Sequence, residues 1–436
     1  MKLAIHGGKP VRSKPFPRHT TIGEEEKTAV ARVLESGVLS KYLGCWHENF
    51  MGGPEVRALE EEWADFFGVR HAIAVNSCTS GLYCAVGAIA TEPGDEIIVT
   101  PYTMSATAMA PLIYNAVPVF ADIEADFFCL DPQAVEKKIT SRTRAILTVD
   151  LFGHPYDADA ISTLARKHGL YVIEDTAQAP GARYHGKPAG TLGDIGIYSL
   201  NYHKHIHCGE GGVVVTEDDA IAERIRLIRN HAEAVVEDKG VADIVNLIGF
   251  NFRMTEMEAA VARCQLKKLP DLLEKRLANE ACLAKKLAQI PALIPPKTRE
   301  DCQHVFYMHA CKFDDREGGI SRDRFIAAVR AELPVFEGRE SEGVRLACGY
   351  VRPLYLQPIF QKKTAYGSQG FPFHHFRRPE EITYRKGDCP VCERMHEREL
   401  FIHELMLPSL SVDDLDDVFR AFEKVWENRT DLRERS

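Results

Sequence analysis

Short apolar segments alternate with amphipathic segments through the first half of the chain, and this alternation restricts the folds open to it. Continuous apolar runs predict strands buried on both faces, and the amphipathic stretches between them predict helices. This order is typical of an α/β protein whose mostly parallel sheet is covered by helices on both sides. The predicted strands cover residues 71–75, 96–99, 117–120, 145–149, 170–174, 195–199 and 212–215.

Helical spacing of apolar residues predicts the other elements. Helices are expected at residues 24–36, 54–67, 79–90, 105–114, 132–139 and 157–168. A long helical segment over residues 255–287, interrupted at Pro270, is expected to lead into a second domain. In that domain we expect a strand at residues 304–313 and helices at residues 320–332 and 412–426. Residues 361–388 have no clear period and predict a long loop or insertion.

Length, charge and cysteine usage narrow the class of protein. At 436 residues the chain is longer than one hydrophobic core usually serves, so two domains are expected. A formal charge of −9 gives no electrostatic reason to expect nucleic acid or a membrane surface as a partner. The chain start lacks the apolar segment of a secretion signal. Twelve scattered cysteines favour a reduced, cytoplasmic protein.

Polar groups follow several predicted strands, where ligands of such sheets bind. Residues 76–81, Asn-Ser-Cys-Thr-Ser-Gly, stand between a strand and a helix. Hydroxyls and free N–H groups at a helix N-terminus can hold a phosphate, and the same residue types also serve as ordinary caps. Asp175, at the end of another strand, is either a carboxylate on the floor of the site or a capping residue.

A single lysine, Lys204, stands among His203, His205 and His207, before the glycine-rich residues 209–212. A lysine that attacks a carbonyl must lose its proton, which burial or a nearby cationic cofactor favours, and the usual product is a Schiff base. The alternative is a solvated surface lysine. Residues 249–256, which open the long helix, are a further candidate group.

In this order the four groups resemble those of the DegT/DnrJ/EryC1/StrS sugar aminotransferases, within fold type I of the pyridoxal-phosphate enzymes. Residues 199–212, Ser-Leu-Asn-Tyr-His-Lys-His-Ile-His-Cys-Gly-Glu-Gly-Gly, resemble the signature S-F-x-x-x-K-x-(I/L)-x-x-G-E-G-G. The similarity covers about residues 1–270 and returns near residues 353–358 and 389–408. It implies a smaller α+β C-terminal domain in addition to the domain that holds the central sheet. The implied divisions are an N-terminal arm over residues 1–21, a large cofactor-binding domain over 22–265 and a small domain over 266–436.

The resemblance also implies a cofactor, pyridoxal 5'-phosphate, and the residues that hold it. Lys204 takes the place of the lysine that binds the cofactor covalently, and Asp175 that of the acid beside the pyridine nitrogen; these two are the expected catalytic residues. Asn251 corresponds to an asparagine that reaches the phosphate from the neighbouring subunit, which implies a homodimer. The other expected cofactor contacts are Ser77, Cys78, Thr79, Met104, Gln178 and Ser199.

The resemblance leaves two other activities to consider. Dehydratases of the family carry histidine at the lysine position, and a non-catalytic regulatory relative would have replaced Lys204 or Asp175. Lys204 stands five residues before Gly209, which is the position of the cofactor-binding lysine in the signature. The resemblance therefore favours an aminotransferase.

The family implies glutamate or glutamine as donor and a ketone or aldehyde of a sugar or cyclitol as acceptor, either a nucleotide-linked keto sugar or an inosose. Residues 3–12, Leu-Ala-Ile-His-Gly-Gly-Lys-Pro-Val-Arg, resemble the cyclitol and antibiotic-sugar branch, so a role in amino-sugar or aminocyclitol biosynthesis is expected. The residues expected to line the substrate pocket are Tyr102, His154, Tyr202, His203, Arg352 and Tyr355.

A zinc site is the remaining alternative. Cys389 and Cys392 have the spacing of a metal-binding pair, with His396 and His403 downstream. There is no second such pair, and the stretch resembles an ordinary P-V-A-E-R segment of the family. No metal is therefore expected.

Overall fold

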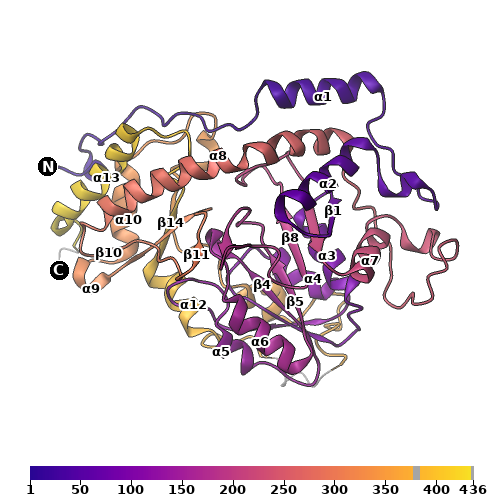
Figure 1. The fold of residues 1–436 in the computed structure, drawn as a ribbon. Helices are drawn as coiled ribbons and strands as arrows, with labels where there is room; N and C mark the ends of the chain where they lie inside the picture. The colour runs from indigo at the N-terminus through magenta and orange to yellow at the C-terminus, as the bar shows by residue number, and fades with distance from the viewer. Residues whose placement is uncertain (377–382, 434–436) are drawn as a thin grey trace.

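A computed structural model describes residues 1–376 and 383–433. Its centre is a seven-stranded sheet in the order β1-β9-β8-β5-β4-β2-β3 (Figure 1). The strands are β1 (His71–Val75), β2 (Glu96–Val99), β3 (Val117–Phe120), β4 (Thr143–Val149), β5 (Tyr171–Asp175), β8 (Ile195–Ser199) and β9 (Gly212–Thr216). β9 runs antiparallel to both of its neighbours, and the other pairs are parallel. The predicted mostly parallel sheet is confirmed.

Helices cover both faces of the sheet. Ile73 and Val214 point to the face that α3 and α7 cover. Their neighbours Ala74 and Val213 point to the opposite face, under α2 and α8. This alternation follows from the two-residue period of a strand. The helices of the large domain are α2 (Pro54–Phe67), α3 (Cys78–Ala88), α4 (Ala106–Ile113), α5 (Pro132–Glu136), α6 (Ala158–His168) and α7 (Asp219–Arg229), of which the sequence patterns missed only α7.

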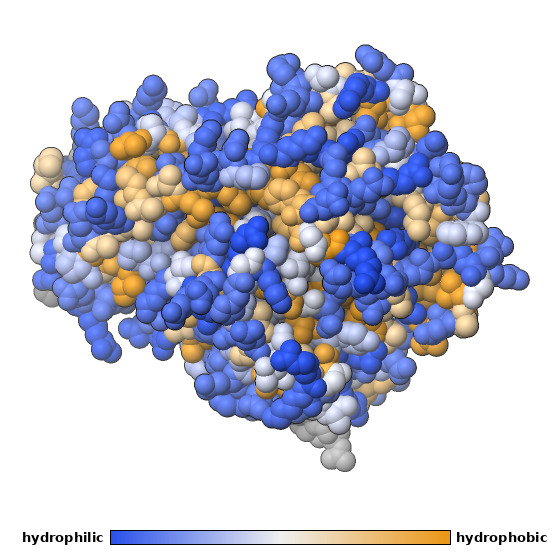
Figure 2. Space-filling view, viewed as in Figure 1, coloured by the Kyte–Doolittle hydropathy of each residue, from blue (hydrophilic) through white to orange (hydrophobic). Residues whose placement is uncertain are grey.

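The helix α1 (Glu24–Ser36) lies along the outer side of α8 (Figure 1). Leu34, Val38 and Leu39, at and after its C-terminal end, are exposed, and apolar atoms show at this end of the molecule (Figure 2). A cluster of exposed apolar residues is typical of an interaction surface. Among the described residues, no helix combines the length and apolar character that a bilayer crossing needs.

The long helix α8 (Glu256–Leu287) runs without a break through Pro270, so the predicted interruption is wrong. Pro270 lies on the exposed side of the helix. Leu266, Leu269 and Leu273 are buried on the other side. Proline removes one backbone hydrogen bond. The packing of the leucines on both sides of Pro270 holds the helix together despite that loss.

A second, antiparallel sheet has the order β10-β12-β14-β13. Its strands are β10 (Leu293–Ile294), β12 (His309–Phe313), β13 (Leu346–Cys348) and β14 (Leu400–His403). The helices α10 (Arg322–Glu332) and α13 (Val412–Glu427) share an apolar cluster with this sheet and with the far half of α8. The N-terminal arm joins the same cluster through Leu3 and Phe16. The division into domains at residue 265 falls inside α8 and stays a prediction.

The strand predicted over residues 304–313 begins only at His309. Residues 304–308 form a loop instead, because their backbone bonds to the large domain: the N–H of Val305 donates to the carbonyl of Gly153, and that of Met308 to the carbonyl of Phe152. This loop carries Tyr307 toward the carboxyl ends of the central strands. Nearby, β11 (Cys302–Gln303) pairs with the hairpin β6 (Arg183–Tyr184) and β7 (Lys187–Pro188).

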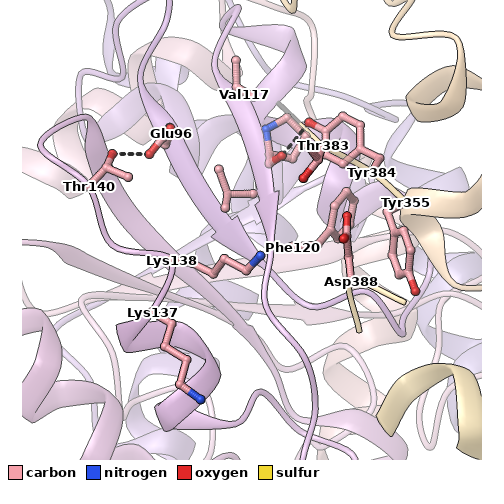
Figure 3. Close-up of a pocket in the computed structure, with 12 residues that line it drawn as sticks. Glu96, Val117, Phe120, Lys137, Lys138, Thr140, Tyr355, Thr383, Tyr384 and Asp388 are labelled. Carbon is pink, nitrogen blue, oxygen red and sulfur yellow. Dashed lines mark hydrogen bonds between the residues drawn. The ribbon is translucent and has the colours of Figure 1, made fainter. Parts of the chain in front are cut away.

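The predicted insertion covers the edge strand β3. The hydroxyl of Tyr384 donates to the carbonyl of Pro118 at 2.8 Å, and the Tyr384 ring packs edge-on against Phe120 (Figure 3). The edge of a sheet invites pairing with other chains, and such cover prevents it. Residues 377–382 of the predicted insertion lie outside the described residues. The remaining short helices are α9 (Asp315–Gly318), α11 (Pro358–Gln361) and α12 (Pro390–Arg394).

Candidate active site

Lys204 lies in the loop that joins β8 to β9. Ser199 and Gly212, the residues at either end of the loop, are directly paired in the sheet. Within the loop the N–H of Lys204 donates to the carbonyl of Asn201 at 2.9 Å. Its Nζ lies 4.6 Å from the centre of the Tyr307 ring, over the ring face. The lysine is therefore held at the carboxyl edge of the sheet, against the loop from the C-terminal half of the chain.

Asp175 ends β5 and is only 4% exposed. Its Oδ2 accepts a hydrogen bond of 2.8 Å from the hydroxyl of Thr107, and its Oδ1 accepts one of 3.1 Å from the N–H of Ala177. Burial raises the pKa of Asp175, while these donors and the charge of Lys204 counteract that rise. The site thus holds one oriented carboxylate in a dry setting.

The N-terminus of α3 forms the third corner. The Oγ of Ser77 caps the helix by accepting from the N–H of Ser80 at 3.0 Å. β9 approaches this turn so closely that a Cβ on Gly212 would lie 2.7 Å from the amide nitrogen of Cys78. Glycine is needed there for that close approach. Free N–H groups and the helix dipole make such a helix start a seat for an anion.

The three corners face one another. Burial and the negative charge of Asp175 raise the pKa of the Cys78 thiol, and the positive charge of Lys204 lowers it. The helix start, the acid and the amine therefore share one space at the carboxyl ends of the strands. Ser199 lies at the same edge, where its Oγ accepts from the N–H of Asn201 at 3.3 Å.

Gln178 connects the site to a tyrosine that the sequence did not single out. Its Oε1 accepts from the N–H of Phe152 at 2.7 Å, and its Nε2 donates to the hydroxyl of Tyr350 at 3.2 Å. Burial raises the pKa of Tyr350 to about 12, and Lys204 and Asp175 both act on it. Tyr102 is fully buried behind Tyr350, whose N–H donates to the Tyr102 hydroxyl at 2.8 Å. Tyr102 thus supports Tyr350 through this hydrogen bond.

Two expected cofactor contacts lie at the margin of the site. Met104 is 60% exposed and stands one turn before Thr107. Asn251 is exposed; its Oδ1 accepts from the Nε of Arg253 at 2.8 Å, and its carbonyl accepts from the side chain of Asn76 at 3.5 Å. Their roles stay predictions.

A cavity of about 610 Å³ opens beside Lys204. Tyr202 and His203 line it, as expected for the substrate pocket, and His207 lies there too. His205 is buried instead, with its Nε2 bonded to the carbonyl of Val305 at 3.1 Å. Charged residues from four other segments also line the cavity, and the sequence patterns gave no sign of them: Arg18, Arg276, Arg339, Glu342 and Glu404.

Three expected substrate residues lie elsewhere. The Nδ1 of His154 donates to the carbonyl of Pro155 at 2.7 Å and its Nε2 accepts from the N–H of Arg299 at 2.9 Å, so both ring nitrogens are used. Tyr355 is buried, donates to Glu393 and borders the cavity under β3 (Figure 3). Arg352 is exposed and does not line the cavity beside Lys204. The structure thus gives His154 and Tyr355 packing roles in place of substrate contacts.

Among the described residues, one buried group has the spacing of metal ligands: His309, Cys311 and His403. The N–H of Leu405 donates to the Nδ1 of His403 at 3.1 Å. The Nε2 of His403 then carries the proton and bonds to the Nδ1 of His309 at 2.9 Å. A metal between the two rings would require that proton on the other nitrogen of His403, against the Leu405 N–H. The hydrogen bonds therefore account for this cluster.

The sequence model of the DegT/DnrJ/EryC1/StrS aminotransferase family matches residues 20–375. The chain belongs to this family.

Relatives support the family membership over the whole length. The spore coat polysaccharide biosynthesis protein SpsC of Bacillus subtilis is 32% identical over 406 residues, which are 92% of this chain and 94% of SpsC. The L-glutamine:2-deoxy-scyllo-inosose aminotransferase of Micromonospora echinospora is 32% identical over 444 residues, 99% of each chain. The X-ray structure of an aminotransferase from Psychrobacter cryohalolentis aligns with a TM-score of 0.77 and 30% identity, covering 96% of this chain and 99% of that one.

Aminotransferases of the family depend on pyridoxal phosphate, and the chain is accordingly a pyridoxal-phosphate-dependent aminotransferase of fold type I. The residues present fit this cofactor. The start of α3, where Gly212 leaves room, suits its phosphate, and the buried Asp175 suits the protonated ring nitrogen. When bound, the cofactor supplies an electron sink for the carbanion left when a substrate loses a proton.

Proposed function

We propose that this enzyme transfers the amino group of glutamine or glutamate to the carbonyl carbon of a polyhydroxylated ring, with an inosose as the first candidate. The observation that carries the proposal is the cavity beside Lys204, whose walls are charged and polar. Carboxylates accept hydrogen bonds from hydroxyls, and Glu342 and Glu404 bring two of them to this cavity. His203 and His207 add ring nitrogens. Such walls suit an acceptor with hydroxyls on most of its carbons.

The relatives point to the same acceptor class. The Micromonospora echinospora enzyme, named for L-glutamine and 2-deoxy-scyllo-inosose, matches 99% of this chain. A putative L-glutamine:3-amino-2,3-dideoxy-scyllo-inosose aminotransferase from Streptoalloteichus tenebrarius is 33% identical, also over 99% of this chain. On this basis we place the enzyme in aminocyclitol or amino-sugar biosynthesis, including that of antibiotics.

Each residue of the site has a proposed task. Lys204 holds the cofactor covalently, and its amine, once free, carries a proton between two carbons as general base and acid. Asp175, oriented by Thr107 and Ala177, keeps the ring nitrogen protonated. Ser77, Cys78, Thr79 and Ser199 would donate hydrogen bonds to the phosphate of the cofactor, and Gln178 and Met104 would border its ring.

The covalent role of Lys204 has a direct test. Borohydride reduction of the purified protein followed by peptide mapping should place the pyridoxyl group on residue 204. Recovery of the label on another residue, or no label in fully loaded protein, would contradict the assignment.

The assembly is part of the proposal. Asn251 is exposed. Asn251 pairs with Asn230, whose side chain donates to the carbonyl of Leu43. Exposed apolar side chains lie on the Leu43 segment and on the segment that precedes Asn251 in the chain, and they include Leu43, Trp46, Ile244 and Ile248. We assign this surface to a second copy of the chain, so that Asn251 reaches the partner's phosphate site. The twelve cysteines are all free thiols, which suits a reducing compartment, and we place the homodimer in the cytoplasm.

The acceptor is tested with labelled donor. Purified enzyme receives glutamine or glutamate carrying ¹⁵N at the α-amino group, together with an inosose or a nucleotide-linked keto sugar. Label in an aminocyclitol supports the proposal, and the Lys204→Ala variant gives the background. Transfer only to nucleotide-linked sugars would replace the inosose by that class. Transfer to neither would overturn the acceptor class and leave the family assignment intact.

A further inference from the structure

Arg276 is a charged side chain buried in the middle of α8, with 4% of its surface exposed. Its Nη1 donates to two backbone carbonyls, that of Phe306 at 3.0 Å and that of Tyr307 at 3.3 Å. Within the described part of the chain, no acidic side chain forms an ion pair with it. Burial lowers the pKa of Arg276, because a charge without a counter-charge is disfavoured in a dry setting.

Arg276 lies at the cavity that the proposed function assigns to the substrates. Arg276 lines the same cavity as Lys204. Tyr307 connects the two: its carbonyl accepts from Arg276, and its ring face lies 4.6 Å from the Nζ of Lys204. Burial lowers the pKa of His19 and of His205, and the positive charge of Arg276 lowers both further. Arg276 is therefore a fixed positive charge at the inner wall of the cavity.

Two other arginines line this cavity: Arg18 is exposed, and Arg339 is already neutralised. Arg339 pairs with Glu342 at 2.7 Å and with Glu404 at 3.5 Å. Arg345 pairs with the same two acids, through its Nη1 to Glu342 at 2.8 Å and its Nε to Glu404 at 2.5 Å. Glu404 raises the pKa of Arg276 from a distance, yet its hydrogen bonds go to other residues. Two acids are thus shared by two arginines, and Arg276 is left over.

An unpaired buried charge is costly, and a bound anion offsets that cost. Of the two substrates in the proposed function, the polyhydroxylated acceptor is neutral and the amino acid carries an α-carboxylate. We infer that Arg276 is the subsite for the α-carboxylate of the amino-acid donor, and that it holds the donor with its amino group toward Lys204. The inference rests on the proposed function, both on its amino-acid donor and on its uncharged acceptor. Arg276 contributes the Nε and Nη2 donors that its backbone contacts leave over.

The test compares each donor with its α-carboxamide, which lacks the negative charge. The donor half-reaction is followed by the absorbance of the cofactor, without any acceptor, for glutamine, glutamate and alanine and their α-amides. Wild-type enzyme should prefer the acid over the amide, and Arg276→Gln should reduce that preference by about 10- to 100-fold, the usual worth of a charge-assisted hydrogen bond. Arg276→Lys should retain part of it.

Arg345→Gln is the matched control, because Arg345 pairs with the same acids and does not line the cavity. Its acid-to-amide preference should equal that of the wild type. Since Arg276→Gln also removes the bonds to the 306–307 loop, only the preference, and not the rate, tests the subsite. If Arg276→Gln slows the reactions of the acid and of the amide equally, Arg276 is a structural residue and the inference is overturned. An equal loss of the acid-to-amide preference in Arg345→Gln would overturn it as well.

A binding measurement separates this inference from the proposed function. Glutaramate has the skeleton of glutamine without the amino group, so it binds and cannot react. Calorimetric titration of the holoenzyme should show binding to the wild type and to Arg345→Gln, and at least about 10-fold weaker binding to Arg276→Gln. Equal binding to all three would overturn the inference. Failure of every acceptor in the labelled screen would leave this result unaffected.

Discussion

The hydroxyl of Thr107, a buried residue of α4, donates a hydrogen bond of 2.8 Å to the Oδ2 of Asp175. Thr107 is fully buried, so no water can take over this bond. The threonine therefore lowers the pKa of a carboxyl group that burial raises. It acts on the reaction only through Asp175 and is a positioning residue.

Replacement of Thr107 by valine should move the acid limb of the activity profile to higher pH. The pKa of Asp175 is raised already, and loss of a donor to the anionic form raises it further, so the carboxylate becomes protonated earlier as the pH falls. At neutral pH we expect kcat/KM to fall by about 10-fold. Thr107→Ser keeps the hydroxyl and should keep the wild-type profile. A valine variant with an unshifted acid limb would contradict this role.

Replacement of Gly212 by alanine should weaken cofactor binding. The added methyl group would lie 2.7 Å from the amide nitrogen of Cys78 and 2.8 Å from the carbonyl carbon of Ser77, so the helix start must shift. Overpacking of this kind costs about 1–3 kcal/mol, and we expect about a 10-fold higher dissociation constant for pyridoxal phosphate, measured by titration of the apoenzyme. Gly23→Ala, whose methyl group would come no closer than 3.6 Å to a neighbouring atom, is the control.

The proposed sharing of sites across a dimer predicts complementation. Lys204→Ala and Asn251→Ala should each be inactive or nearly so. When the two variants are unfolded and refolded together, each mixed dimer contains one site with both native residues, so about a quarter of the wild-type sites should return. If Asn251 served its own subunit, no mixture would recover activity. Each variant refolded alone gives the baseline.

The burial of His154 predicts an acid-sensitive fold. Burial lowers the pKa of this ring from 6.5 to about 4. Between these two values the ring is protonated in the unfolded chain and neutral in the folded one. The contribution of His154 to stability is therefore complete above the unfolded pKa and is lost as the pH falls toward the folded one. Between about pH 7.5 and about pH 5 this loss should amount to about 2 kcal/mol.

Thermal unfolding at the two pH values measures this effect. His154→Gln should lose less stability on acidification than the wild type does, because the titrating group is gone. His185→Gln, which alters an exposed histidine, should lose as much as the wild type. Equal pH dependence of the two variants would contradict the assignment.

Local patterns predicted the parts of the site that lie at strand ends. Asp175 and Lys204 each follow a strand whose apolar run is visible in the sequence, and the strand places them. Tyr350 and Arg276 could not be found in this way, because they reach the site from distant segments whose packing alone brings them there. Thr107 carried a weak signal, a polar residue on the inner side of an apolar helix.

Contacts between distant segments also explain where the predicted helices and strands differ from the structure. Pro270 by itself predicts a break in the helix, whereas the buried leucines around it decide the outcome. The strand predicted at residues 304–313 was too long by five residues, because contacts with Phe152 and Gly153 override the local preference. β13, with three residues, is too short for a pattern to show, and the sequence patterns also missed β14.

The direct pairing of Ser199 with Gly212 closes the loop that carries Lys204 at its base. A change of residue inside that loop therefore need not alter the sheet, since both ends of the loop are fixed by the same pair of residues. A lineage could exchange the reactive group at position 204 without disturbing the scaffold that carries it. The reactive residue and the sheet that positions it can evolve separately.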